Sequence, residues 1–261
     1  MNHKLAIAAI CCAPLLVQAE EKKAEESPFK ASAEFGALFK TGDTKSGDLK
    51  VGLDFGYEEG QWRSTLDFDV LVRKTEKEVA QDDGTTSDEF ETTDQKWTIV
   101  SQTNYTIEPK GKNYVYANAS YEENRFSSFD SQSSISSGWG RRWFENETTT
   151  LDADIGPGYK REVLKEADEN GETTQDAFIV QAQALYKHKI NEHVEFKQLV
   201  VAKYAPKEGE NSTYKAETSI TTKLIETLQL KFSFKVDHNT DVDVGKEKTN
   251  TQTAVTLVYS F

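Results

Sequence analysis

Apolar and polar residues alternate along most of the chain after residue 28. In the segment 29–40, Phe29 and Phe35 fall on one set of alternate positions, which we call a parity, while Lys30 and Glu34 fall on the other. Strict alternation over such a length predicts a β-strand with one apolar and one polar face. The pattern recurs in further segments at 49–58, 62–73, 97–105, 114–126, 133–144, 151–159, 178–186, 194–204, 214–224, 228–237 and 251–261. The alternation is weak at 133–144, and tyrosines on both parities leave the faces of 114–126 unassigned.

The connections between these segments alternate in length. Short connections fall at 58–61, 107–112, 144–147, 190–193 and 224–227. Mostly longer, polar and acidic ones fall at 41–46, 80–88, 127–132, 166–172, 206–210 and 241–247. Bacterial transmembrane barrels have short periplasmic turns and longer outward loops. The sequence therefore predicts an all-β protein, a single antiparallel transmembrane β-barrel of about twelve strands. A soluble sandwich also alternates, but it requires no such rhythm of connections.

The polar parity of these segments carries charges of both signs. Eight residues form a predicted charge network: Lys50, Asp54, Arg63, Asp67, Asp69, Arg73, Asp152 and Asp154. Six more charged residues follow on the same parity: Lys197, Lys203, Lys215, Glu217, Lys231 and Lys235. In a barrel this parity lines the lumen, where opposite charges on neighbouring strands pair. We expect Arg63 and Arg73 to pair there with Asp67 and Asp69.

Aromatic residues gather near the ends of the segments that meet the short connections. They are Phe29, Tyr57, Trp62, Tyr105, Tyr114, Phe144, Tyr259 and Phe261. Aromatic side chains are enriched where a barrel wall crosses the membrane interface. We therefore expect these residues to form a girdle at the periplasmic rim.

The two ends of the chain carry export signals. A basic start with Lys4, an apolar run from Leu5 to Val17 and a small residue at Ala19 predict a secretory signal peptide over 1–19. Residues 20–28 are then an N-terminal periplasmic segment, and residues 29–261 are the barrel domain. Both cysteines, at positions 11 and 12, lie in the signal peptide. The mature protein is therefore expected to have no disulfide.

The last residues alternate and end on an aromatic side chain. Tyr259 and Phe261 resemble the C-terminal signal that the bacterial barrel assembly machinery reads. We therefore expect this machinery, outer-membrane lipid and lipopolysaccharide as partners, and the bacterial outer membrane as the location.

Composition excludes one class of partner. The chain has 31 Lys and Arg residues against 44 Asp and Glu residues, a net charge of −13. Such an excess repels phosphate backbones, and no basic cluster offsets it, so nucleic-acid binding is not expected.

The sequence contains no recognisable catalytic signature. The His-x-Ser-Asn-Gly signature of the outer-membrane phospholipase barrel is missing, and the histidines after the leader lack a nucleophile at a recognisable spacing. The carboxylate pairs Asp67/Asp69 and Asp152/Asp154 have basic neighbours, which favours lumen salt bridges over acid–base catalysis. We predict no catalytic residue and no cofactor.

Acidic residues gather in three outward loops. They are Asp237, Asp241, Asp243 and Glu247; Asp82, Asp83, Asp88 and Glu89; and Glu166, Asp168, Glu169 and Glu172. Oxygen ligands at this density suit hard divalent cations, which bridge lipopolysaccharide phosphates. A solvated acidic loop is the alternative.

A glycine-rich centre connects the chain to a known family. The stretch Ser137-Gly-Trp-Gly-Arg-Arg-Trp-Phe144 followed by Gly156-Pro-Gly-Tyr-Lys160 resembles the centre of the DUF481 family of salt-induced outer-membrane proteins of the YdiY type. Lys160 replaces the more common arginine. The resemblance covers most of the mature chain and implies an outer-membrane barrel, without an established activity. The glycines around Pro157 are expected to bend the strand through a bulge.

Two functions remain open at this point. A narrow solute or ion channel would use the mixed lumen charges to control passage. A structural or envelope-stress protein would instead be plugged by its own salt bridges. Twelve strands leave a small lumen, which is compatible with both.

Overall fold

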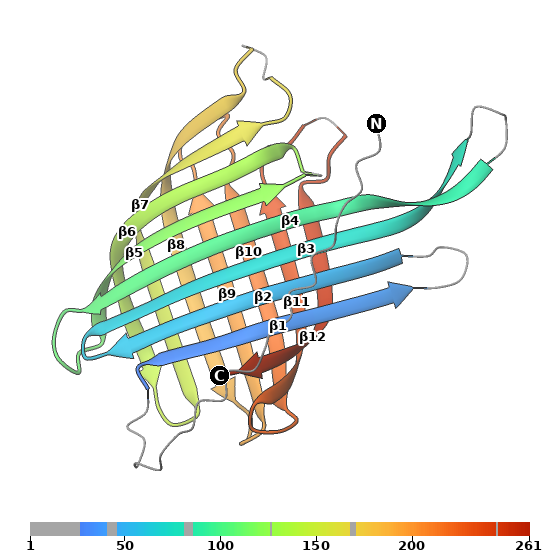
Figure 1. The fold of residues 1–261 in the computed structure, drawn as a ribbon. Helices are drawn as coiled ribbons and strands as arrows, with labels where there is room; N and C mark the ends of the chain where they lie inside the picture. Colours follow the sequence, from blue (N-terminus) through green and yellow to red (C-terminus); the bar gives the residue numbers. More distant parts are fainter. Residues whose placement is uncertain (1–26, 41–45, 81–85, 126, 168–170, 244) are drawn as a thin grey trace.

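The computed structural model describes residues 27–40, 46–80, 86–125, 127–167, 171–243 and 245–261. Within these ranges the chain forms strands and no helix. The strands are β1 (Phe29–Lys40), β2 (Ser46–Glu59), β3 (Trp62–Ala80), β4 (Thr86–Thr106), β5 (Asn113–Asn124), β6 (Phe129–Glu145), β7 (Thr149–Leu164), β8 (Thr174–Lys189), β9 (Val194–Tyr204), β10 (Thr213–Lys223), β11 (Leu228–Asn239) and β12 (Thr249–Ser260). Each pairs antiparallel with its sequence neighbours, and β1 pairs with β12 to close the barrel (Figure 1). The predicted all-β barrel of twelve strands is confirmed.

One prediction about strand length is wrong. The loop expected at 80–88 is shorter, because β3 and β4 continue as a paired hairpin to Ala80 and Thr86. This hairpin projects beyond the rest of the wall (Figure 1). A register shift between Arg73 and Lys74 marks its start. Beyond that point the sequence is polar on both parities, so no alternation signals a strand there.

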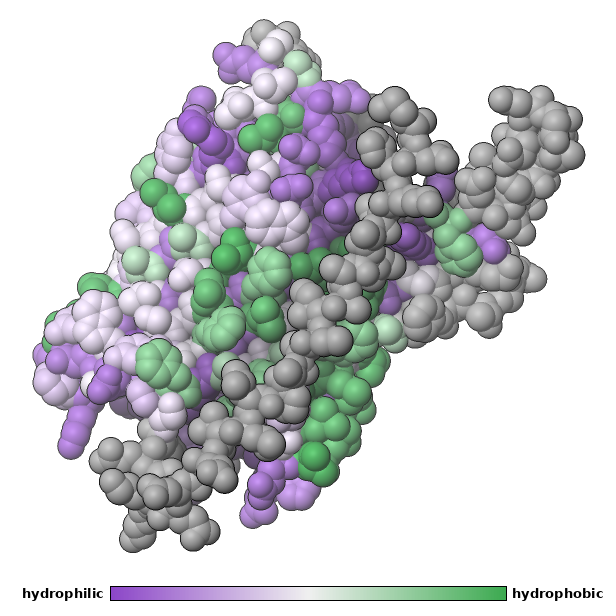
Figure 2. Space-filling model, viewed as in Figure 1, coloured by the Kyte–Doolittle hydropathy of each residue, from purple (hydrophilic) through white to green (hydrophobic). Residues whose placement is uncertain are grey.

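The apolar parity faces outward and the polar parity faces inward. Ile135 is 64% exposed and Phe232 is 49% exposed, whereas Ser233 and Gln181 are buried. Apolar side chains accordingly lie across the outer surface of the barrel wall (Figure 2). A soluble domain does the reverse, because exposing large contiguous apolar surface to water is unfavourable. The arrangement is that of a barrel whose outer wall contacts lipid. No helix among the described residues is long and apolar enough to cross a membrane.

Several of the aromatic residues at the rim pack against one another, and one predicted member of the girdle lies elsewhere. Phe29 and Tyr57 have ring centroids 4.9 Å apart, and so do Trp62 and Tyr105. Tyr114 does not belong to this girdle, because it points into the lumen and is only 2% exposed. Its neighbour Val115 faces outward instead. The structure thereby assigns the faces of the segment that carries tyrosines on both parities.

The seam between β1 and β12 is short. Four residue pairs are in register there, from Ser32 with Ser260 to Phe35 with Leu257. Beyond the last strand, the Phe261 amide donates to the Ala31 carbonyl at 2.9 Å. By comparison, β1 and β2 pair along the whole of Phe29–Lys40. The backbone ladder alone therefore holds β1 to β12 over about a third of the strand.

The central glycines allow close approach and do not form the expected bulge. The register of β7 with β8 runs unbroken through Gly156, Pro157 and Gly158. A Cβ atom built on Gly156 would lie 2.1 Å from the Ser137 carbonyl oxygen, and one on Gly138 would lie 2.3 Å from the Ile155 carbonyl oxygen. The backbones of β6 and β7 therefore meet where only glycine fits.

Candidate functional site

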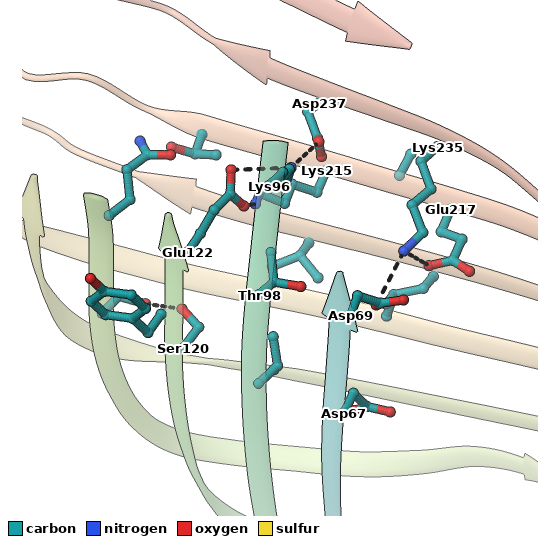
Figure 3. A pocket seen from close by; sticks show the side chains of 18 of the residues that line it. Asp67, Asp69, Lys96, Thr98, Ser120, Glu122, Lys215, Glu217, Lys235 and Asp237 are labelled. Carbon is teal, nitrogen blue, oxygen red and sulfur yellow. Dashed lines mark hydrogen bonds and ion pairs between the residues drawn. The ribbon is translucent and has the colours of Figure 1, made fainter. Parts of the chain in front are cut away.

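The inward faces of the strands enclose a cavity of about 250 Å³. Its lining includes charged residues from β1 to β4 on one side and from β9 to β11 on the other. Figure 3 shows these side chains reaching toward one another from separate strands. Fewer of the lining residues are apolar, among them Leu71 and Val100, which face Leu199 and Val201 across the ring of strands. The lumen is therefore a polar compartment with an apolar strip.

Six charges of alternating sign form a closed circuit, which we call the charge ring. In order, its members are Glu34, Lys50, Asp69, Lys235, Glu217 and Lys231. Glu34 is the most enclosed member. Its Oε1 lies 2.6 Å from Lys50 Nζ, and its Oε2 lies 3.0 Å from Lys231 Nζ. Thr256 Oγ1 also donates to Glu34 Oε1 at 2.7 Å.

The remaining contacts of the charge ring are longer. Asp69 lies 3.7 Å from Lys50 and 3.5 Å from Lys235. Glu217 lies 3.3 Å from Lys235 and 3.5 Å from Lys231 (Figure 3 shows the contacts of Lys235). Because Glu34 belongs to β1 and Lys231 to β11, the ring bridges the strands on either side of β12. Side chains therefore support the seam where the backbone ladder is short.

A second group of charges crosses the lumen, and we call it the lumen strap. Lys96 of β4 lies 3.1 Å from Glu122 Oε1 and 2.9 Å from Asp237 Oδ2. Lys215 of β10 also pairs with Glu122. Since β4 and β5 stand opposite β10 and β11 in the ring of strands, the Lys96–Asp237 and Lys215–Glu122 contacts run from wall to wall, whereas Lys96–Glu122 joins neighbouring strands (Figure 3). The strap therefore obstructs the lumen at this level.

A third group lies nearer the short turns. Arg142 forms a two-pronged contact with Asp152, at 3.0 Å and 3.3 Å, and Arg63 lies 3.5 Å from the same carboxylate. Asp154 accepts hydrogen bonds from Tyr114 and Gln102, each at 3.2 Å. Gln183 of β8 donates to Gln102 of β4 at 3.2 Å, which adds another contact across the lumen.

The predicted charge network is divided among these groups. Lys50 and Asp69 belong to the charge ring, and Asp152 and Asp154 belong to the group near the turns. Arg63 pairs with Asp152 and Arg73 pairs with Asp48 at 2.9 Å, so neither arginine pairs with Asp67 or Asp69. That expected pairing is wrong, because alternate residues on one strand point the same way while partners come from other strands.

Two predicted lumen residues lack an ion-pair partner within the described part of the chain. Asp54 accepts a hydrogen bond from Ser32 Oγ at 3.2 Å, and Asp67 contacts the Asp54 carboxyl group. Both side chains line the cavity.

Sequence reasoning missed several partners. Glu34 stands on the polar parity of a recognised segment, so that parity could have identified it, and Lys96 directly precedes the recognised segment 97–105. Glu122 lies in the segment whose phase was ambiguous. Asp237, expected in a cation-binding loop, lies within β11 and pairs with Lys96, which corrects that assignment.

The acidic loops yield no metal centre in the described ranges, where no group of three or more His, Cys, Asp or Glu side chains could hold an ion. Asp82, Asp83, Asp168 and Glu169 lie outside the described residues, and the side chains of Asp88 and Glu89 are not described.

Several solved barrel structures are similar to this chain. One is the translocator domain of the autotransporter NalP from Neisseria meningitidis, with a TM-score of 0.47, 9% identity, and coverage of 92% of this chain and 90% of that one. Another is the COG4313 outer membrane channel from Pseudomonas putida F1, with a TM-score of 0.46, 11% identity, and coverage of 94% and 100%. The NanC porin gives a TM-score of 0.45, 10% identity, and coverage of 88% and 98%. At these scores the likeness is limited to general architecture.

Sequence comparison places the chain in a family. No curated protein sequence matches it significantly. Residues 33–261 match the family model described as "Protein of unknown function, DUF481". Because the match covers nearly all of the barrel domain, the chain belongs to the DUF481 family.

Proposed function

We propose that this protein is an outer-membrane β-barrel that acts as a narrow solute or ion channel of low conductance. The observation that carries the proposal is the cavity of about 250 Å³, lined by charges of both signs, inside a wall with an apolar exterior. Charged side chains lining a pore attract and select ions through their field. The lumen strap crosses this space, so each opening should carry little current.

A second candidate function is a non-conducting structural barrel. The contacts that cross the lumen at several levels favour it, among them the lumen strap and the Gln102–Gln183 hydrogen bond. In that case the same ion pairs would hold the walls together and seal the interior. Induction by salt, which the YdiY resemblance implies, remains a prediction under either function.

Conductance of the refolded protein in planar bilayers separates the two candidates. The channel proposal expects small discrete current steps from the unmodified barrel. Replacing Lys96 and Glu122 together, as Lys96→Gln with Glu122→Gln, removes all three strap contacts and both charges at once. We expect larger steps from this variant, because the obstruction that joins β4 and β5 to β10 and β11 is lost.

The matched control is Arg161→Gln. Arg161 pairs with Asp176 at 2.7 Å on the outer face, so its loss should leave the current unchanged. A silent unmodified barrel that conducts only after the strap is removed would support the structural candidate. Silence from both proteins would contradict the proposal that the lumen is a solute path.

The location and partners follow from the same proposal. The predicted leader at 1–19 would direct export, and Tyr259 with Phe261 would be read by the barrel assembly machinery. Phe261 is 79% exposed, so little of its side chain is committed to packing within the barrel. We propose no enzymatic activity, since the hydroxyl–imidazole contacts of Thr149 with His188 and of Thr249 with His238 do not line the lumen cavity.

A further inference from the structure

Two lysines stand side by side on the inner wall formed by β8 and β9. Lys187 and Lys197 are directly opposite each other in the ladder. Neither forms an ion pair or a hydrogen bond within the described part of the chain. Like charges directly opposite each other on adjacent strands are unfavourable. The pair therefore makes a positive wall that no nearby carboxylate neutralises by contact.

A matching pair of carboxylates stands on β2 and β3. Asp54 and Asp67 are directly opposite each other in that ladder, and neither has an ion-pair partner among the described residues. Both line the cavity, as does Lys197. Asp69 lies on the same strand but is held in the charge ring by Lys50 and Lys235. The second wall is therefore negative over Asp54 and Asp67.

The two walls face each other. In the twelve-strand ring, β2 lies six positions from β8, and β3 lies six positions from β9. Asp54, Asp67 and Lys197 line the same cavity, so the two walls border one space in the lumen. Two other carboxylates, Asp152 and Glu195, attract Lys187, but each has a basic neighbour of its own. Arg142 contacts Asp152, and Lys189 is directly opposite Glu195 in the ladder.

We propose that the space between these walls binds small zwitterions, solutes of amino-acid size that carry one carboxylate and one ammonium group. The lysine wall would hold the carboxylate and the aspartate wall the ammonium. The two walls create a field across the lumen, which orients a dipolar solute and favours it over a singly charged one. The apolar strip of Leu199 and Val201 would meet the carbon chain between the charges. This inference rests on the proposed function as a solute path and names its substrate class.

Equilibrium dialysis with the detergent-refolded mature barrel tests the proposal. The probes are γ-aminobutyrate, butyrate and butylammonium, which share a carbon chain and differ in charge. We expect γ-aminobutyrate to bind at least about tenfold more tightly than either singly charged probe, since it makes a charge-assisted contact at both walls. Lys197→Gln and Asp67→Asn should each weaken its binding by about tenfold. Lys223→Gln, a lysine at the rim of β10, should leave binding unchanged.

A reversed variant separates binding from structural support. Asp54→Lys and Asp67→Lys combined with Lys187→Asp and Lys197→Asp exchange the charges of both walls, so a zwitterion can turn around and bind again. Heat-modifiable migration on gels confirms that each variant is folded. Recovery of γ-aminobutyrate binding in the reversed variant supports the proposal. Equal affinity for the three probes, or unaltered affinity in both single variants, would overturn it even if the barrel conducts. Intact binding by a barrel that never conducts would contradict only the channel proposal.

Discussion

Replacing Glu34 by alanine is expected to destabilise the barrel by about 3–5 kcal/mol, because it leaves two buried lysines without their nearest counter-charge. Glu34 is only 3% exposed and contacts Lys50, Lys231 and Thr256. Removing one partner of a buried ion pair costs more than the pair contributes, since the remaining charge stays desolvated. The contacts that are lost lie beside the seam, where β1 and β12 share only four residue pairs. Urea unfolding in detergent, followed by tryptophan fluorescence, measures the change.

Two variants control for this experiment. Glu34→Gln retains an acceptor for Thr256 and the lysines, so it should lower the stability of the barrel less than Glu34→Ala does. Glu58→Ala removes a glutamate of the same parity from β2, where the side chain is exposed and has no described ion pair, and stability should be unchanged. A Glu34→Ala barrel as stable as the unmodified protein would show that the charge ring does not support the seam.

Gly156→Ala is expected to prevent normal assembly of the barrel. The added methyl group would lie 2.1 Å from the Ser137 carbonyl oxygen and 2.6 Å from the Gly138 Cα atom. Both obstacles are backbone atoms and no rotamer change relieves them, so β6 and β7 must separate. The cost should reach or exceed the roughly 1–3 kcal/mol that overpacking usually causes. The yield of heat-modifiable barrel after refolding measures it.

The matched control is Gly56→Ala, in the inward parity of β2. There the nearest atoms to an added Cβ lie 3.9 Å away, which is ordinary contact. We expect normal yield from this variant. Equal yields from Gly156→Ala and Gly56→Ala would contradict the close approach of β6 and β7.

The sequence predicts the strands well because lipid and lumen impose opposite chemistry on alternate residues. Where that contrast is missing, prediction fails. The hairpin at the ends of β3 and β4 is largely polar on both parities, and the alternation predicts no strand between residues 73 and 97. The fifth segment has Tyr114 and Tyr116 on its inward parity, so its face became clear only from the structure.

The ion-pair partners inside the lumen do not follow from the alternation of residues. Parity shows that Lys96 and Asp237 both face inward, yet nothing in the spacing shows that strands so far apart in sequence place them 2.9 Å apart. The closure of the barrel and the reach of long side chains decide that contact. The glycines at 156 and 158 likewise read as a bulge signal, whereas close strand packing is what requires them.

Quenching by brominated lipid acyl chains tests most directly whether the apolar wall contacts a membrane. Single cysteines at Phe35, Ile135 and Phe232 sample β1, β6 and β11 around the wall, and all three side chains are exposed. A chain expressed from residue 20 contains no other cysteine, so a fluorescent label reports on one position. Glu192, in a short turn, serves as the control outside the hydrocarbon region. The structure predicts strong quenching at all three wall positions and weak quenching at Glu192. Quenching at the wall no stronger than at Glu192 would contradict a lipid-embedded barrel.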